Sequence, residues 1–469
     1  MKGSEWRGVI HFVGIGGIGM SGIADVLCTL GYRVQGSDQA ENAQVKRLRS
    51  KGVKVFIGHR EDNIQKAEVV VVSSAIKKDN VEVQAARAAR IPVIRRAEML
   101  AELMRFKHSV VIGGSHGKTT TTSLVASVLS VASYDPTVVN GGVIDQWGSN
   151  ARVGASDWIV VEGDESDGTF TRLPSRVSVV TNIDPEHIDH YGSLAALEEA
   201  FLVFASNVPF YGFCVLCIDH PRVHRLVASL WDRRVITCGL SSSADVRGVN
   251  LRYRGMKTLF DVEFSGLLSG YGRLSDVEVP LVGEHNVKNT LAALSVGVGL
   301  GIAGVDMKRA LSSAPRVRRR FYSVGVSPRG ATIIDDYAHH PAEIRAVLAA
   351  ARASFPQGRC LVIFQPHRYS RLQALFDDFC YALSDADVVI VAPVYAAGEQ
   401  PIDGIDRDHI IARLRAHGHS EVVALQGEDQ LAELIHTHGN KGDVILCLGA
   451  GSIGQWVQNL QGLAEAQVS

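Results

Sequence analysis

The chain has 469 residues, 46% of them hydrophobic and 21% charged, which is enough for two to four globular domains with ordinary cores. Its 48 Lys and Arg residues balance 49 Asp and Glu residues, which argues against a nucleic-acid or anionic-membrane scaffold. Seven scattered cysteines are too few for a disulfide framework, and no apolar run approaches the roughly 20 residues of a membrane span. We therefore expect a cytoplasmic multidomain protein with no nucleic-acid partner and no membrane insertion.

Short runs of β-branched residues, separated by helical patterns, recur along the chain. Runs of this kind without alternation are typical of strands buried on both faces of a parallel sheet. Such strands are expected at Val9–Val13, Val69–Val72, Val110–Ile112, Trp158–Val161, Val177–Thr181, Thr332–Ile334, Leu361–Phe364, Val388–Val391 and Val444–Leu448. Helical patterns at Asn80–Arg90, Pro341–Ala353 and Arg371–Leu383 indicate repeated strand–helix–strand units, so we predict an α/β fold.

Two breaks divide the chain into three expected α/β domains. The first is a basic turn at residues 104–108, and the second is an arginine-rich segment at 314–323. Residues 241–280 are richer in Ser, Gly and Arg and show strand-like alternation, so we expect antiparallel strands inserted there. The predicted domains are 1–107, 108–319 and 320–469.

The first expected strand leads into a glycine-rich turn and then a helix. Gly14 permits the tight turn, and Gly16 lets the backbone approach a diphosphate at the helix N-terminus. Asp38 follows a further expected strand, Tyr32–Gln35, at the spacing of a ribose-binding acid. The pattern predicts nucleotide or nucleotide-sugar binding, with a purely structural turn as the alternative.

A second glycine-rich turn, Gly-Gly-Ser-His-Gly-Lys-Thr-Thr at 113–120, carries a stronger signal. Its backbone N–H groups can cradle phosphates, Lys118 can reach the β- and γ-phosphates, and Thr119 can ligate Mg²⁺. The turn is one residue shorter than the common phosphate-binding loop. The alternative is a tight turn with a solvated lysine.

Two later strands end in residues that suit a phosphate-bound cation. Glu162 ends one strand, and His187 follows another, so both belong at the sheet edge where ligands bind in open α/β folds. The acidic run at 164–167 is expected to be mainly a solvated loop. The Cys214–Cys217 pair lies inside an apolar run and is interpreted as core rather than as a zinc or redox site.

Six motifs in one order then identify a family. They are Gly-Ile-Gly-Gly-Ile-Gly-Met-Ser-Gly at 14–22, Gly-Ser-His-Gly-Lys-Thr-Thr-Thr at 114–121, Glu-Gly-Asp-Glu-Ser-Asp at 162–167, Gly-Glu-His-Asn at 283–286, Asp-Asp-Tyr-Ala-His-His-Pro at 335–341 and Gln-Pro-His-Arg-Tyr-Ser-Arg at 365–371. With this set the chain resembles the Mur ligases over almost its whole length. The resemblance implies an N-terminal Rossmann-like domain for a UDP-sugar, a central ATPase domain and a C-terminal Rossmann-like domain for an amino acid.

The resemblance also implies roles for individual residues. ATP would be held by Gly114, Ser115, His116, Gly117, Lys118, Thr119, Thr120, His285, Asn286, Asn289 and Asp336. Thr119, Glu162 and His187 would serve Mg²⁺, with Mn²⁺ as an alternative ion. Arg320 would contact the phosphates, and His339 would be a candidate base for the incoming amine. The sugar nucleotide would contact Gly16, Gly17, Asp38, His59 and Ser73, and the amino-acid segment would use Tyr337, His367, Arg368 and Arg371.

Several Mur ligases carry a modified lysine about a dozen residues beyond the position of His187. This chain has no lysine between His187 and Lys257, which favours the family member that joins L-alanine to UDP-N-acetylmuramate through an acyl phosphate. Glu198 or Glu199 is expected to supply negative charge instead. The alternatives are a tripeptide-adding ligase acting on the same sugar nucleotide, an NAD-dependent oxidoreductase and a non-enzymatic nucleotide switch. We expect a monomer or a homodimer.

Overall fold

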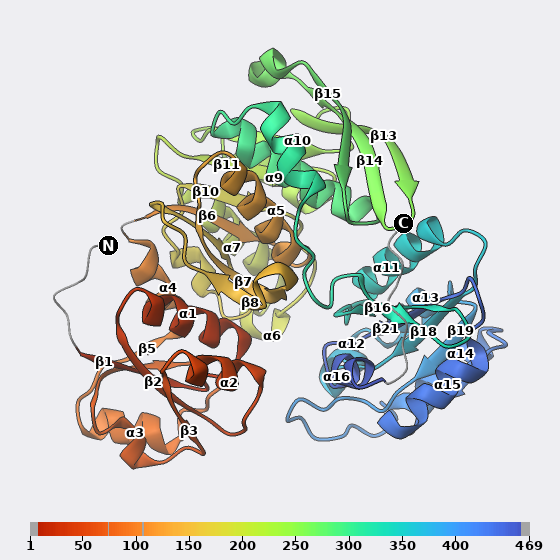
Figure 1. Ribbon diagram of the computed structural model, residues 1–469, viewed down its shortest axis with the longest axis horizontal. Helices are drawn as coiled ribbons and strands as arrows, with labels where there is room; N and C mark the ends of the chain where they lie inside the picture. Colours follow the sequence, from red (N-terminus) through yellow and green to blue (C-terminus); the bar gives the residue numbers. More distant parts are fainter. Residues whose placement is uncertain (1–7, 74, 106, 461–469) are drawn as a thin grey trace. The chain divides into compact units, whose positions relative to one another are not determined.

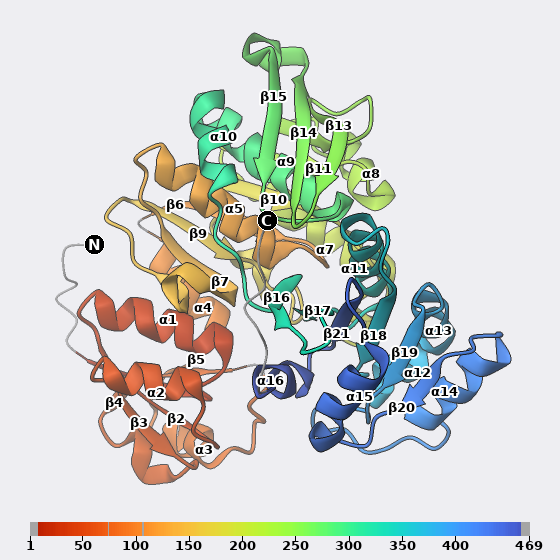
Figure 2. The same ribbon diagram turned by 45° about the vertical axis from the view of Figure 1, so that its right-hand side comes forward.

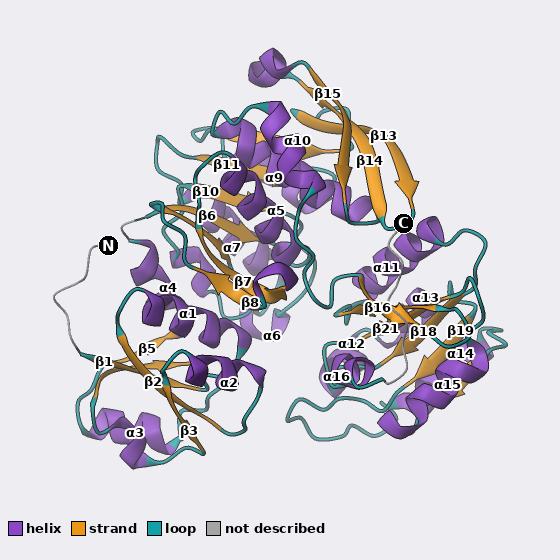
Figure 3. Cartoon of the chain, viewed as in Figure 1, coloured by secondary structure: helices purple, strands orange, loops and turns teal. Residues whose placement is uncertain are grey.

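The computed structural model describes residues 8–73, 75–105 and 107–460. The chain separates into two compact units, each described by itself below. The first comprises Met1–Val249, Asp261–Val277 and Lys288–Pro315, and the second comprises Asn250–Phe260, Glu278–Val287 and Arg316–Ser469. Helices and strands alternate through most of the chain (Figure 3).

The N-terminal sheet is fully parallel and has the strand order β3-β2-β1-β4-β5. Its strands are β1 (Val9–Val13), β2 (Arg33–Asp38), β3 (Lys54–Ile57), β4 (Ala67–Val72) and β5 (Val93–Arg95). The helices are α1 (Ile18–Thr29), α2 (Ala43–Ser50), α3 (Val81–Ala88) and α4 (Arg96–Met104). Helices α1 and α3 lie on opposite sides of this sheet (Figure 1). The strand order reverses between β1 and β4, and ligands of open α/β sheets bind in the crevice at such a point.

The middle sheet has ten strands in the order β15-β14-β13-β12-β11-β10-β6-β9-β7-β8. They are β6 (His108–Gly113), β7 (Thr137–Ile144), β8 (Ser149–Arg152), β9 (Trp158–Glu162), β10 (Val177–Val180), β11 (Phe213–Cys217), β12 (Val235–Gly239), β13 (Val246–Arg254), β14 (Lys257–Phe264) and β15 (Arg273–Val279). The helices are α5 (Lys118–Val131), α6 (Ile188–Tyr191), α7 (Leu194–Ser206), α8 (Pro221–Ser229), α9 (Glu284–Gly299) and α10 (Gly304–Ser312). The extra strands expected at 241–280 are confirmed, and β13 and β14 form a hairpin through a two-residue turn (Figure 2).

The C-terminal sheet has the order β16-β17-β21-β18-β19-β20, and only β16 is antiparallel to its neighbour. The strands are β16 (Tyr322–Val326), β17 (Thr332–Asp336), β18 (Cys360–Phe364), β19 (Val388–Val391), β20 (Val422–Ala424) and β21 (Val444–Leu448). The helices are α11 (Pro341–Ser354), α12 (Tyr369–Ala374), α13 (Phe376–Leu383), α14 (Arg407–Ala416), α15 (Leu431–His438) and α16 (Ile453–Gln458). The single helix expected over 371–383 was wrong, because the backbone of Leu375 leaves the helical region (φ −126°, ψ 25°) and divides it into α12 and α13.

In the first unit, one cluster of buried hydrophobic side chains runs from the N-terminal sheet into the middle sheet. It includes Phe12 and Ile23 from the first sheet and its helix, and Val139, Ala151 and Phe201 from the middle region. The Asn150 amide of β8 also donates a hydrogen bond of 2.7 Å to the Ile18 carbonyl at the start of α1. The two sheets therefore share one core. Within the described part of the chain, no helix is long and apolar enough to cross a membrane.

Candidate functional site

The second glycine-rich turn connects β6 to α5 as expected, and its glycines are required by their surroundings. Gly114 and Gly117 have φ values of +134° and +82°. A Cβ on Gly114 would lie 2.0 Å from the Thr181 hydroxyl, and one on Gly117 would lie 2.5 Å from the Asn289 amide oxygen. The close approach places Asn289 of α9, which the resemblance assigned to the ATP set, against the turn.

The segment after β10 holds this turn through several hydrogen bonds. The His116 N–H donates to the Asn182 side chain at 2.7 Å, and the Thr181 hydroxyl donates to the His116 carbonyl at 2.7 Å. The Asp184 N–H donates to the Ser115 hydroxyl at 2.8 Å. Asn182 and Asp184 were not singled out from the sequence, although they lie within five positions of His187.

Asp184 is flanked by two histidines. The His116 and His220 rings each lie 3.3 Å from its carboxylate. Hydrogen bonds from these rings hold the pKa of Asp184 well below its usual range. A fixed negative charge therefore lies next to the second glycine-rich turn and contacts the His116 ring.

Lys118 is held inside the turn by oxygen acceptors. Its Nζ donates to the Gly114 and Ser115 carbonyls at 2.5 and 3.1 Å and to Glu165 Oε1 at 3.0 Å. Burial lowers the pKa of Lys118, but the charges of Glu165 and Glu162 outweigh it and raise that pKa above its usual range. Lys118 is therefore a cation at neutral pH.

The expectation that the acidic run is mainly solvated was wrong for Glu165. Its side chain is only 2% exposed. Burial raises the pKa of Glu165 to about 7, with a further rise from the Asp164 charge and an opposing effect of Lys118. Asp164 pairs with Arg96 at 2.7 Å. The error arose because a run of acids at a strand end resembles a surface loop, and only the tertiary contact with Lys118 distinguishes it.

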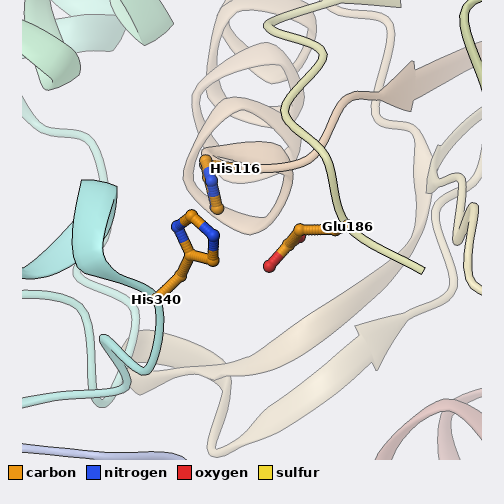
Figure 4. Close-up of side chains that lie close together, drawn as sticks. All are labelled: His116, Glu186 and His340. Atoms are coloured by element: carbon orange, nitrogen blue, oxygen red, sulfur yellow. The ribbon is translucent and has the colours of Figure 1, made fainter. Parts of the chain in front are cut away.

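Three side chains in this region have ligand atoms close enough together to hold one cation. Donor atoms of Glu165, Glu186 and His187 all lie within 4.8 Å of one another. Carboxylate oxygens and an imidazole suit Mg²⁺ or Mn²⁺, so the residues fit a divalent ion. Figure 4 shows the side chains of Glu186, from the segment after β10, and of His116, from the turn before α5. Glu186 was missed from the sequence, although it is adjacent to His187.

The other residues predicted to serve the bound cation are not in the Glu165, Glu186 and His187 cluster. Glu162 ends β9, and its carboxylate accepts a 2.7 Å hydrogen bond from the Gly141 N–H of β7. Thr119 is buried in the first turn of α5. Glu198 pairs with Arg222 and Arg225 at 3.2 and 2.8 Å. These two arginines offset the negative charge of Glu198.

The first glycine-rich turn lies between β1 and α1, at the reversal of strand order. The Gly16 N–H donates to Asp38 Oδ2 at 2.8 Å, and the Asn42 amide donates to the Gly16 carbonyl at 3.2 Å. Gly17 caps the twelve-residue helix α1, and Ser73 N–H donates to the Val13 carbonyl at 3.4 Å. In this structure Asp38 holds the turn in shape.

In the second unit, Asp336 ends β17 and closes the following turn. It accepts hydrogen bonds from the Phe321 and Ala338 N–H groups at 2.6 and 2.8 Å. Burial raises the pKa of Asp336 to about 6, against the lowering effect of the Arg320 charge. The Arg320 guanidinium lies 5.3 Å from the Tyr337 ring centre, so Arg320 and Tyr337 are neighbours.

The predicted amino-acid residues gather after β17 and β18. The ring centres of His339 and His367 are 6.1 Å apart, and Arg371 Nη1 lies 3.3 Å from His367 Nδ1. Burial and the charge of Arg371 lower the pKa of His367 to about 4, so this ring is neutral at pH 7. Arg368 instead binds Glu399, with Nε 2.5 Å from Oε1. Glu399 lay outside every sequence motif.

The remaining predicted residues have local roles in the structure. His285 and Asn286 lie in the first turn of α9, where the Asn286 amide donates to the Val282 carbonyl at 2.7 Å.

Cys214 and Cys217 are buried in β11, which confirms their interpretation as core. Cys217 Sγ lies 3.3 Å from the Sγ of Cys238 on the adjacent strand, and all seven cysteines are free thiols.

Comparisons with known proteins agree along the chain. Family models for the Mur ligase catalytic domain, the Mur ligase middle domain and the glutamate ligase domain of Mur ligases match residues 9–108, 112–297 and 319–451. Two UDP-N-acetylmuramate–L-alanine ligases, from Rhodopseudomonas palustris (strain BisB18) and Methylorubrum extorquens (strain PA1), are each 55% identical over 98% of both chains.

Solved structures give the same fold. The UDP-N-acetylmuramate–alanine ligase of Thermotoga maritima matches with a TM-score of 0.81 and 31% identity, covering 96% of this chain and 97% of that one. A murein peptide ligase from Psychrobacter arcticus matches with a TM-score of 0.70 and 21% identity, covering 97% and 100% of the two chains. The three-domain α/β architecture expected from the sequence is confirmed.

Proposed function

Because the chain belongs to the Mur ligase family, we propose that it joins L-alanine to the lactyl carboxylate of UDP-N-acetylmuramate and converts ATP to ADP and phosphate. One observation carries this function: the 55% identity over 98% of the chain to ligases of that name. The tripeptide-adding alternative is disfavoured, because a solved ligase of that kind is 26% identical over 67% of this chain, against 55% over 98% for the L-alanine ligases. The product is a precursor of bacterial peptidoglycan.

The first chemical step activates a carboxylate. The lactyl carboxylate attacks the γ-phosphorus of ATP, a new O–P bond forms, and the bond to ADP breaks to give an acyl phosphate. The protein forms no covalent bond, so positioning and charge neutralisation supply the rate. Lys118 lies at the N-terminus of α5 and holds a positive charge there, which supports its role beside the γ-phosphate. The triphosphate would take the place of Glu165 as its partner.

A divalent cation fits the same edge of the middle sheet. The ion would be held by Glu165, Glu186 and His187. Thr119 and Glu162, which were predicted from the sequence to serve the cation, would complete its ligands. The bound ion would neutralise phosphate charge. We propose Mg²⁺, with Mn²⁺ as an alternative. The turn residues Gly114, Ser115, His116, Gly117 and Thr120, with His285, Asn286, Asn289 and Asp336, complete the proposed ATP set.

The second step forms the amide. The neutral amine of L-alanine attacks the acyl carbon, and inorganic phosphate leaves with the bonding electron pair of the carbon–oxygen bond. Arg371 is proposed to bind the alanine carboxylate, because a guanidinium fork matches a carboxylate with two parallel hydrogen bonds. Tyr337, His367 and Arg368 would line the same pocket, and Arg320 would face the phosphates. His339 would take the amine proton, since its Nδ1 is fixed by the Tyr337 carbonyl at 3.1 Å.

The N-terminal sheet is proposed to bind the sugar nucleotide at its reversal of strand order. Gly16, Gly17, His59 and Ser73 would line this site, with Asp38 holding the turn. We propose domain limits of 1–107, 108–319 and 320–469, a monomer or homodimer, and residence in the cytoplasm. The seven free thiols support the last of these.

The decisive experiment is measurement of ADP release with every combination of substrates. Release should require ATP, Mg²⁺, UDP-N-acetylmuramate and L-alanine together. Equal ADP release without the sugar nucleotide would contradict the ligase function. Ligation of the tripeptide in place of L-alanine would assign the chain to the other activity.

A further inference from the structure

A buried polar network around Glu82 contacts His59, one of the residues proposed to line the sugar-nucleotide site. Its centre is Glu82, which is fully buried at the start of α3. One carboxylate oxygen accepts from the Asn63 amide and the Arg60 N–H at 2.5 and 3.2 Å. The other accepts from the Ser37 hydroxyl at 2.5 Å and lies 3.2 Å from the His11 ring and 3.5 Å from His59 Nδ1. Every lone-pair region of this carboxylate is therefore occupied.

The network fixes where its protons lie. Burial alone would raise the pKa of Glu82, but hydrogen bonds from His11, Ser37 and Asn63 lower it to about 2, so Glu82 is an ionised acceptor. The single hydroxyl proton of Ser37 is donated to Glu82. The 3.0 Å contact between Ser37 Oγ and His59 Nδ1 must then be a hydrogen bond that His59 donates. A neutral His59 consequently carries its proton on Nδ1 and presents a lone pair on Nε2.

That lone pair has no partner among the described residues. The His59 side chain is only 9% exposed, and its Nε2 is a buried atom without a hydrogen bond. Buried polar atoms are almost always paired in folded proteins, so such an atom requires an explanation. Here the explanation lies in its position, because His59 follows β3 at the carboxyl edge of the N-terminal sheet, where nucleotides bind.

The same serine also connects His59 to the glycine-rich turn. The Ser37 carbonyl accepts hydrogen bonds from the Gly14 and Ile15 N–H groups at 2.9 and 3.0 Å. Its neighbour Asp38 accepts from the Gly16 N–H, and the Asp38 carbonyl accepts from the Gly58 N–H at 2.8 Å. The turn after β1, proposed to bind the diphosphate, and His59, which follows β3 two strands further along, are thus both held by Ser37 and Asp38 at the end of β2.

We propose that Ser37 and Glu82 are positioning residues that fix His59 in a single tautomer, so that its Nε2 accepts a hydrogen bond from an N–H or O–H group of the sugar nucleotide. The uracil imide and the hydroxyl groups of the ribose or the amino sugar are the donors with this chemistry. This inference rests on the proposed function, because it assumes that the N-terminal sheet binds the sugar nucleotide.

A pair of substitutions at position 59 separates the two ring nitrogens. His59→Asn keeps a donor near Nδ1 for Ser37 and removes Nε2, whereas His59→Gln places an acceptor near Nε2. We expect His59→Asn to weaken the binding of UDP-N-acetylmuramate about tenfold, the effect of losing one buried hydrogen bond, and His59→Gln to recover most of that affinity. Affinity for ATP should not change. The control is His224→Asn, since His224 is exposed on α8.

Calorimetric titration with UDP-N-acetylmuramate and with UDP alone gives the readouts. A loss that is equal for both ligands places the donor on the uridine part, and a loss only for the full substrate places it on the amino sugar. Glu82→Gln should raise the KM for UDP-N-acetylmuramate several-fold with kcat at saturation unchanged, because it alters binding and leaves the chemistry intact.

Two results would overturn the inference. One is an unchanged affinity of His59→Asn in an active enzyme, and the other is an equal loss in His59→Asn and His59→Gln, which indicates a structural role alone. Failure of the wild-type chain to bind UDP-N-acetylmuramate would instead contradict the proposed function, so the two failures are distinguishable.

Discussion

The two glycine-rich turns of the first unit have the same strand–turn–helix form and opposite electrostatics. The turn after β1 contains no basic side chain, and its shape is held by the carboxylate of Asp38. The turn after β6 contains Lys118, which is paired with the buried Glu165. A turn with only backbone N–H groups suits a diphosphate that is bound and left intact. The turn that contains the positively charged Lys118 suits phosphoryl transfer, since the transition state of that reaction requires charge stabilisation.

The largest expected effect follows from removing that charge. Lys118→Ala should lower kcat at least about a hundredfold, because loss of one preorganised charge-stabilising group raises the barrier by about 3 kcal/mol. Binding of UDP-N-acetylmuramate, at the other turn, should stay normal. Steady-state ADP release and calorimetry measure the two effects. The matched control is Lys46→Ala, an exposed lysine on α2, and wild-type turnover in Lys118→Ala would contradict the assignment.

The second-largest expected effect is a change in the free energy of unfolding with pH, caused by the titration of Glu165. Its folded-state pKa of about 7 lies above the unfolded value, so its contribution is full below about pH 4 and is lost as pH rises through 7. Between pH 5 and pH 7 wild type should lose about 2 kcal/mol of unfolding free energy that Glu165→Gln does not lose. Urea unfolding of both proteins at the two pH values measures this difference. Parallel pH profiles would show that Glu165 titrates normally.

A third strand–turn–helix segment, after β18, extends the comparison to the second unit. There Arg368 is already paired with Glu399, whereas Arg371 contacts the neutral His367. Arg371→Lys should raise the KM for L-alanine about tenfold, because the ammonium group cannot reproduce a bidentate contact. Acyl-phosphate formation should persist and can be trapped by reduction. Arg413→Lys, in an exposed pair with Asp377, is the control, and unchanged alanine kinetics would move the carboxylate site to Tyr337 or Arg368.

The smallest expected effect concerns the first turn. A Cβ on Gly16 would lie 2.8 Å from the Asp38 carboxylate, so Gly16→Ala must shift the turn. We expect about a fivefold weaker affinity for UDP-N-acetylmuramate, comparable to the loss of one hydrogen bond, with normal affinity for ATP. Gly270→Ala is a suitable control, because a Cβ there meets open space. A loss of ATP affinity as well would mean that the two turns are not independent.

Local signals in the sequence were enough to predict many of the strands and both glycine-rich turns. The predicted bounds of β1, β19 and β21 agree with the structure, because each is a short run dominated by apolar residues, with Gly8 and Gly14 beside β1, Asp387 before β19, and Asp443 and Gly449 beside β21. Lys118 and His187 could be proposed because each follows a strand or a glycine-rich turn in the sequence. Contacts between distant segments could not be found in this way. The buried side chain of Glu165 contacts Lys118, which is 47 positions away in the sequence. The contact between Ser37 and Glu82 joins residues that are 45 positions apart.

The hydrophobic core that α1 shares with β7 and β8 determines how this protein can be divided. A chain that began at the predicted boundary near residue 108 would leave Val139 and Ala151 without the partners that cover them. Apolar surface exposed in this way favours aggregation. The region of the N-terminal sheet is therefore not an interchangeable module, and a chimaera that exchanges it must also carry a matching α1 and a matching face on β7 and β8.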